Sequence, residues 1–355
     1  MKQANRIFLL GCVFAISIAG QAQEKSTAQK AYADSLKNHE YKHTFPILGT
    51  QAYQNGYDVQ YPAGIMLNTM NMKQHIVISD FELGFQSAAG NAIALQDAEF
   101  IKFGDNNNIA STTTVRPDLW VFPFLNVYGL FGFGHSSTDI NISHLSFPNY
   151  SEIPTLPINM TANVKQNIAI NGFGAMVAGG VGPLFFTMDV NWTWSKPDLL
   201  EQALRTNIIG MRLGHVFQNK RKPEKNFGIW VGTMRGSMGG ALSHGSIPLN
   251  TLIPASMVEK RNEVVANYNT WYDGLGVIQQ EMVNKTALPE LMNRLENWEA
   301  AGVIEYQFDR QLKAAWNGTI GCQYQFNKRW MLRSEGGVIG DRKSFMLSVN
   351  YRFCV

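Results

Sequence analysis

The stretch LFFTMDVNWTW, residues 184–194, decides the fold because its side chains alternate between two chemistries. Every second residue from Leu184 to Trp194 is large and apolar, and the residues between them are mostly polar. A strand with this period presents one oily and one wet face. The run has the length that a tilted strand needs to cross a bilayer, about 9–11 residues. The pattern predicts a strand with lipid on one side and water on the other.

The same alternation returns in residues 311–326 and in residues 343–353. Aromatic residues gather at the ends of the runs, where the interfacial girdles of a membrane barrel lie, namely Trp192, Trp194, Tyr324, Phe326, Tyr351 and Phe353. Residues 166–188 carry no charge and are long enough for a membrane helix. However, Pro183 and the glycines before it disfavour a helix and predict two strands that meet at a turn.

The composition of the 355-residue chain agrees with dispersed apolar residues: 45% are hydrophobic, 16% are charged, and the mean hydropathy is −0.14. These values exclude a bundle of membrane helices and a disordered chain. Loss of Lys2 and Arg6 with a leader would turn 30 basic residues into 28, against 27 acidic ones. No electrostatic case for nucleic-acid binding remains.

A chain with long alternating strands that finishes on Tyr351-Arg352-Phe353 resembles bacterial outer-membrane β-barrel proteins. The resemblance covers roughly residues 115–353. It implies an all-β, antiparallel transmembrane β-barrel, for which we expect about 10–12 strands, with 14 not excluded. It also implies two partners, the outer-membrane lipid and the barrel assembly machinery, which reads the last strand up to Phe353. Cys354 and Val355 depart from the usual ending.

The N-terminal residues predict export. Residues 1–22 have the basic start, apolar core and small residues of a cleavable signal peptide, and Cys12 offers a lipoprotein alternative with a short apolar core. We expect residues 23–56 to be a periplasmic segment and residues 57–353 to form the barrel. The expected location is the cell outer membrane.

Strands counted back from the C-terminus predict nine spans, and a tenth from residues 93–103 would make the total even. Residues 75–85, with part of 57–70, could extend this to twelve. Residues 141–165 and 243–310 are then the long outer connections. Within the second, residues 254–301 have helical spacing and predict an extracellular insertion of two helices, beginning with a capping box at Ser256. These helices could pair with each other, restrict the barrel mouth, or dock an extracellular partner.

Charged residues on the expected inward faces predict either an interior salt-bridge network or a selectivity filter. They are Asp189, Arg212, Lys313, Arg333, Glu335 and Arg352.

Two His-x-Ser pairs suggest catalysis, and the weaker is His244 with Ser246, which is flanked by Gly and Pro in an expected loop. His135 and Ser137 share one face of a strand, and this His-x-Ser spacing resembles outer-membrane phospholipase A and lipid A deacylases, in which His activates Ser. The Asn-Gly context of that motif is missing. No cofactor-binding or metal-binding motif occurs, and the two mature cysteines, Cys322 and Cys354, have no metal-ligand spacing.

The sequence therefore predicts an outer-membrane β-barrel without enzymatic activity, acting as a passive channel or small-solute transport protein. The alternatives are a structural or adhesive surface protein anchored by its barrel, and an outer-membrane lipid acyl hydrolase that uses His135 and Ser137.

Overall fold

The computed structural model describes residues 27–38, 40–86, 92–147, 150, 152–222, 224–239, 243–248, 257–297 and 303–354. The predicted signal peptide and Ser256 of the predicted capping box lie outside this part of the chain. Among the described residues, no helix combines the length and the apolar character that a membrane span requires.

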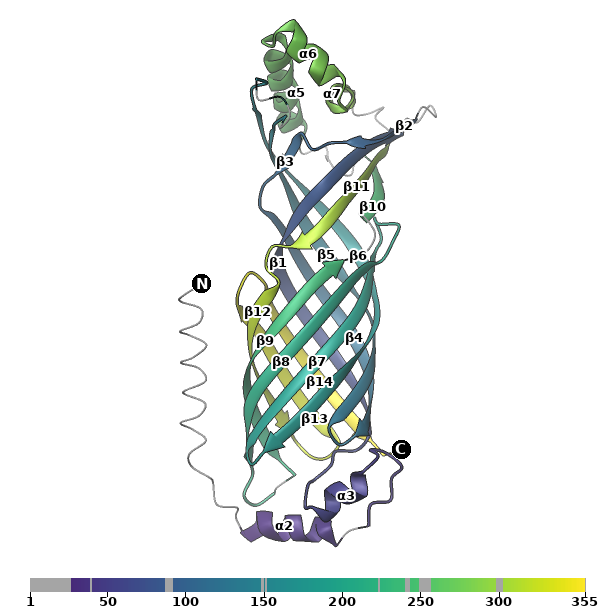
Figure 1. Ribbon diagram of the computed structural model, residues 1–355, viewed down its shortest axis with the longest axis vertical. Coiled ribbons are helices and arrows are strands. Elements are labelled where there is room, and N and C mark those ends of the chain that lie inside the picture. Colours follow the sequence, from purple (N-terminus) through teal and green to yellow (C-terminus); the bar gives the residue numbers. More distant parts are fainter. Residues whose placement is uncertain are drawn as a thin grey trace.

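Ten of the strands described form a closed antiparallel barrel (Figure 1). The ring closes because β1 pairs with β14 on one side and with β4 on the other over the same residues. The ten strands are β1 (Ala63–Gln86), β4 (Asn106–Phe122), β5 (Leu125–Leu145), β6 (Leu156–Val181), β7 (Leu184–Pro197), β8 (Leu204–Gln218), β9 (Asn226–Gly239), β12 (Trp316–Gln325), β13 (Trp330–Ile339) and β14 (Lys343–Phe353).

Side-chain burial in this ten-strand barrel is the reverse of that in a water-soluble protein. Large apolar side chains such as Phe131, Phe173 and Leu347 are exposed on the outer face, and polar ones such as Asn126 and Asn350 are buried inside. Alternation along each strand produces both faces at once, because successive side chains point to opposite sides. The outer face is an apolar belt of the kind that lipid covers.

Beyond the belt, three strands continue and are joined by further elements at the end away from the C-terminus (Figure 1). We call this the cap region. It comprises β1 from Ile76, β5 from Thr138 and β6 up to Gln166, together with β2 (Ala92–Asp97), β3 (Ile101–Phe103), β10 (Ser243–Pro248), β11 (Val303–Leu312), α5 (Val258–Asp273), α6 (Val277–Asn284) and α7 (Leu288–Glu296).

At the other end, helices α2 (Thr27–Lys37) and α3 (Gly49–Gln54) lie beneath the barrel beside the C-terminus (Figure 1). They are tied there by polar contacts. Tyr32 donates a hydrogen bond to Asp58 at 2.6 Å, and Lys328 of the β12–β13 turn lies 3.0 Å from the same carboxylate. We call this the terminal end.

The nine strands counted back from the C-terminus are present, with two corrections. Residues 311–326 do not form one strand. The chain leaves its pairing with β1 at Leu312 and enters a new pairing with β9 and β13 at Trp316. The tenth strand of the ring is β1, whereas residues 93–103 form β2 and β3 in the cap region.

The helical insertion contains three helices, because Gly274–Gly276 separates α5 from α6.

Candidate functional site

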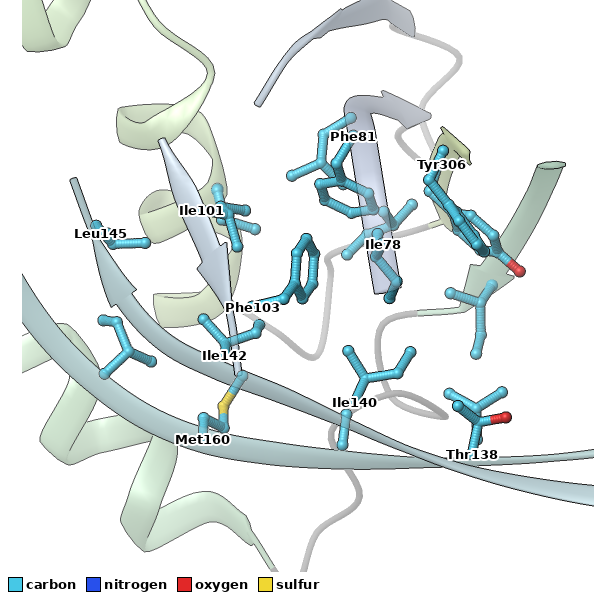
Figure 2. Close-up of a pocket in the computed structure, with 18 of the residues that line it drawn as sticks. Ile78, Phe81, Ile101, Phe103, Thr138, Ile140, Ile142, Leu145, Met160 and Tyr306 are labelled. Carbon is cyan, nitrogen blue, oxygen red and sulfur yellow. The ribbon is translucent and has the colours of Figure 1, made fainter. Parts of the chain in front are cut away.

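The cap region contains an apolar chamber of about 160 Å³. Figure 2 shows side chains from β1, β3, β5, β6 and β11 converging on one space, among them Ile78, Phe103, Ile140, Met160 and Tyr306. Inward positions on these strands carry Ile, Met and Phe where the ten-strand barrel carries amides and hydroxyls. Among the described residues that line this chamber, Arg310 alone is charged.

The helices form part of the chamber wall. Val264 of α5 and Leu291, Met292 and Leu295 of α7 line it. The apolar faces of the helices join a core of buried residues from β1, β3 and β6. The predicted stripes therefore pack on the extended strands of the barrel rim as well as on each other, which buries side chains that a two-helix pair would leave in water.

A central chamber of about 310 Å³ occupies the middle of the lumen and is lined by methionines, amides and hydroxyls. It shares Gln166 and Arg310 with the apolar chamber, so the two are adjacent. The unbranched thioether side chains of the methionines adapt readily to neighbours of different shape. The methionines are Met66, Met70, Met72, Met176, Met234, Met238 and Met346.

An ion-pair network crosses the lumen beneath the central chamber. Arg212 of β8 donates to Glu335 of β13 through Nε at 2.5 Å and Nη2 at 2.9 Å, and it also pairs with Asp189 of β7. Trp230 Nε1 and Arg333 Nη2 donate to Glu335 at 2.9 and 3.1 Å. Two strands, β9 and β12, separate β8 from β13 in the sheet, so this network links distant parts of the wall.

A terminal chamber of about 190 Å³ follows below the network and shares Arg212 and Arg333 with the central chamber. A second ion pair lines this chamber. Arg352 of β14 donates to Asp118 of β4 at 2.9 Å and to the carbonyl oxygens of Tyr61 and Pro62 at 2.7 and 2.9 Å. The segment that precedes β1 therefore passes under the lumen.

The three chambers have a positive charge balance. Six arginines line them, against three acidic residues, a difference of three positive charges. The arginines are Arg116, Arg212, Arg310, Arg333, Arg342 and Arg352, and the acids are Asp118, Asp189 and Glu335.

Of the six charged residues expected in the lumen, Asp189, Arg212, Arg333, Glu335 and Arg352 line chambers. Lys313 does not. Its side chain is half exposed and pairs with Asp105 at 2.6 Å. Inward positions are even-numbered on β11 and odd-numbered on β12, so continuing one alternation through residues 313–315 assigns Lys313 to the wrong face.

Sequence reasoning missed Arg116, Arg310, Arg342 and Asp118 as lumen residues. Arg116 and Asp118 alternate with outward-facing Val115 and Pro117, and this parity could have identified them. Arg310 had no such signal, because it was assigned to a loop, and its strand pairs with β1 across more than two hundred residues.

His135 and Ser137 lie on the outer face of β5, beyond the apolar belt. His135 Nδ1 is 2.7 Å from Asn167 Oδ1, and Ser137 accepts a hydrogen bond from Asn163 at 2.9 Å. Each residue thus has its own partner on β6, and neither lines a chamber. Among the residues described, no cluster of three His, Cys, Asp or Glu side chains could hold a metal ion.

Comparisons with known proteins give similarity in architecture only. No family model matches the chain, and no curated protein matches its sequence. Among solved structures, the translocator domain of the autotransporter NalP from Neisseria meningitidis is 11% identical, covers 92% of this chain and 100% of its own, and has a TM-score of 0.31. The β domain of the Bordetella autotransporter BrkA is 10% identical, covers 82% of this chain and 100% of its own, and has a TM-score of 0.29. The Ralstonia pickettii toluene transporter TbuX is 8% identical, covers 82% of this chain and 90% of its own, and has a TM-score of 0.28.

Proposed function

We propose that the protein is a passive transport protein of an outer membrane, and that small solutes pass through the lumen of its ten-strand barrel. Three adjacent chambers lie along that lumen, and this observation carries the proposal. A barrel that only anchors a surface domain has no need of such a sequence of spaces. The apolar belt supports the membrane location, because exposed side chains such as Phe133 and Leu347 are stable against lipid and unfavourable in water.

The ion-pair network is the proposed constriction. The network consists of side chains that are joined by hydrogen bonds, and it contains no backbone segment. A passing solute therefore meets groups that can exchange hydrogen-bond partners. The positive balance of the lumen predicts a preference for anions. The cap region adds an outer filter, since a solute that enters from the helical end meets apolar side chains first.

The test is conductance in a planar bilayer. We expect the full chain to form small, anion-selective pores. Replacement of residues 254–301 by a short Gly/Ser linker removes the helical wall of the apolar chamber. Loops tolerate such changes in length at small entropic cost, so the barrel should still assemble. The conductance of the shortened protein should exceed that of the parent.

A matched control separates the lumen from the surface. Lys313→Gln removes a charge that lies outside the three chambers and should leave conductance and selectivity unchanged. Arg333→Gln removes a lumen charge and should reduce the anion preference. If the parent and the shortened protein are both silent, the lumen is not a route, and the anchored surface protein becomes the better interpretation.

A further inference from the structure

We infer that the boundary between the apolar and central chambers is a binding site for a small amphiphilic anion, one apolar ring or short chain that carries a single carboxylate. Arg310 would hold the carboxylate, and the apolar chamber would hold the ring. The inference rests on the proposed function and names the class of solute that its lumen selects.

The first observation is an unpaired cation inside the molecule. Arg310 is a lining residue of both chambers, and its Nε is buried without a hydrogen-bond partner. Within the described part of the chain, no carboxylate forms an ion pair with its guanidinium. Each of the other lumen arginines has a partner for its guanidinium. Arg212, Arg333 and Arg352 pair with acids, and Arg342 donates to Gln74 at 3.0 Å. Arg116, whose Nε is likewise buried without a partner, donates through Nη2 to Asn126 at 3.3 Å and lies over the Tyr128 ring.

The second observation is that this cation keeps its charge. β11 lies beyond the apolar belt, and burial lowers the pKa of Arg310 to about 10. The guanidinium is therefore protonated at neutral pH. A buried charge without a partner is unfavourable, and an anion that enters the site would remove that cost. A carboxylate matches the planar fork of the guanidinium with two hydrogen bonds.

The third observation is the size and chemistry of the adjoining space. In the part of the chain that the structure describes, the polar side chains that line the apolar chamber besides Arg310 are Thr138, Gln166 and the Tyr306 phenol, and the other lining residues are apolar. Thr138 already accepts a hydrogen bond from Asn108 at 2.8 Å. The volume of about 160 Å³ is close to the roughly 150 Å³ of an apolar protein cavity that binds benzene. The chamber thus fits one aromatic ring.

Together these features distinguish an anionic amphiphile from the alternatives. An inorganic anion would satisfy Arg310 but leave the apolar walls unfilled. A neutral hydrocarbon would fill the walls and leave the guanidinium unpaired. A ligand with both parts satisfies both.

The experiment is titration calorimetry on the full protein in phosphatidylcholine nanodiscs, with empty nanodiscs as the blank. The probes are 3-phenylpropionate and its neutral analogue 3-phenylpropanol. We expect the parent to bind the acid more tightly than the alcohol. Arg310→Gln should weaken binding of the acid at least tenfold and change binding of the alcohol less than twofold, because hydrogen bonds to charged groups are the strong ones.

Two further variants complete the design. Arg205→Gln removes an exposed arginine on the outer face of β8 and should change neither affinity. Ala162→Leu enlarges a buried residue of the chamber wall and should weaken binding of both probes at least fivefold. Circular dichroism and heat-modifiability on gels establish that each variant is folded.

The inference is overturned if the parent binds neither probe, if it binds the alcohol as tightly as the acid, or if Arg310→Gln binds the acid as the parent does. Binding and conduction are measured separately. A protein that binds 3-phenylpropionate but is silent in the bilayer contradicts the proposed transport alone, and one that conducts but does not bind contradicts this inference alone.

Discussion

The ten-strand barrel and the cap region share three continuous strands but have opposite polarity. In the barrel, exposed side chains are apolar and buried ones are polar, as with Phe173 outside and Asp189 inside. In the cap region the buried side chains are apolar, as with Ile158 and Leu145. The first region is arranged for lipid outside and water inside, and the second for water outside.

Strand β6 passes through both regions with a continuous inward–outward alternation, although its pairing with β5 shifts between Pro157 and Met160. Its outward positions are polar from Asn159 to Asn167 and become apolar at Phe173 and Val177. Its inward positions are large and apolar at Leu156 and Ile158 in the cap region and include glycines in the barrel. The same backbone geometry therefore serves two solvents, and the residue at each position alone decides which one it meets.

The largest expected effect comes from the charged interior of the barrel. Glu335→Ala leaves Arg212 and Arg333 buried without their shared carboxylate. Breaking a buried pair in this way costs about 3–5 kcal/mol of unfolding free energy. The exposed pair Glu281–Lys285 is the control, and Glu281→Ala should cost less than about 1 kcal/mol. Urea unfolding in lipid vesicles, followed by tryptophan fluorescence, measures both. Equal losses would mean that the network is solvated.

A smaller effect separates the two outer faces of β6. Phe173→Arg places a charge in the apolar belt and should cost about 2–4 kcal/mol if the position is near the bilayer midplane. Thr161→Arg lies on the same face of the same strand in the cap region and should cost less than about 1 kcal/mol, as surface substitutions usually do. The same unfolding assay compares the two. Similar costs would place the membrane boundary elsewhere on β6.

Removal of one methyl group tests the two apolar surfaces against each other. Ile158→Val creates a small cavity in the packed cap region and should cost about 0.5–1.5 kcal/mol. Ile320→Val, on the exposed outer face of β12, should cost less, because lipid tails fill the vacated space. A larger loss at Ile320 would indicate that another protein surface covers that position.

Alkaline pH should weaken the cap region. Burial raises the pKa of Tyr306 to about 12, whereas the unfolded residue titrates near 10. Between these values the unfolded state has lost a proton that the folded state keeps, so stability falls as pH rises from about 10 to 12. Tyr306→Phe should reduce this loss, measured as protease susceptibility of β10 and β11 against pH. An unchanged pH profile in the variant would assign the loss to another group.

Local patterns were sufficient for most of the barrel. Alternation in residues 184–194 and 343–353 predicted both faces of β7 and β14, because a strand in a closed barrel reports its two environments directly in its sequence. The same reasoning failed across residues 313–315. There the chain exchanges one set of partner strands for another, and the inward parity changes with it.

The sequence by itself determined that this chain alternates as a barrel does, that residues 254–301 contain helices, and that five of the charged side chains face inward, namely Asp189, Arg212, Arg333, Glu335 and Arg352. Only the tertiary structure decided that β1 closes the ring, that the helices form a wall of the apolar chamber, and that Arg310 lies unpaired between two chambers. The physical reason is the range of the interactions. Local sequence sets which side of the sheet a side chain points to. Distant parts of the chain must come together to close the ring, to build the chamber walls and to pair a buried charge.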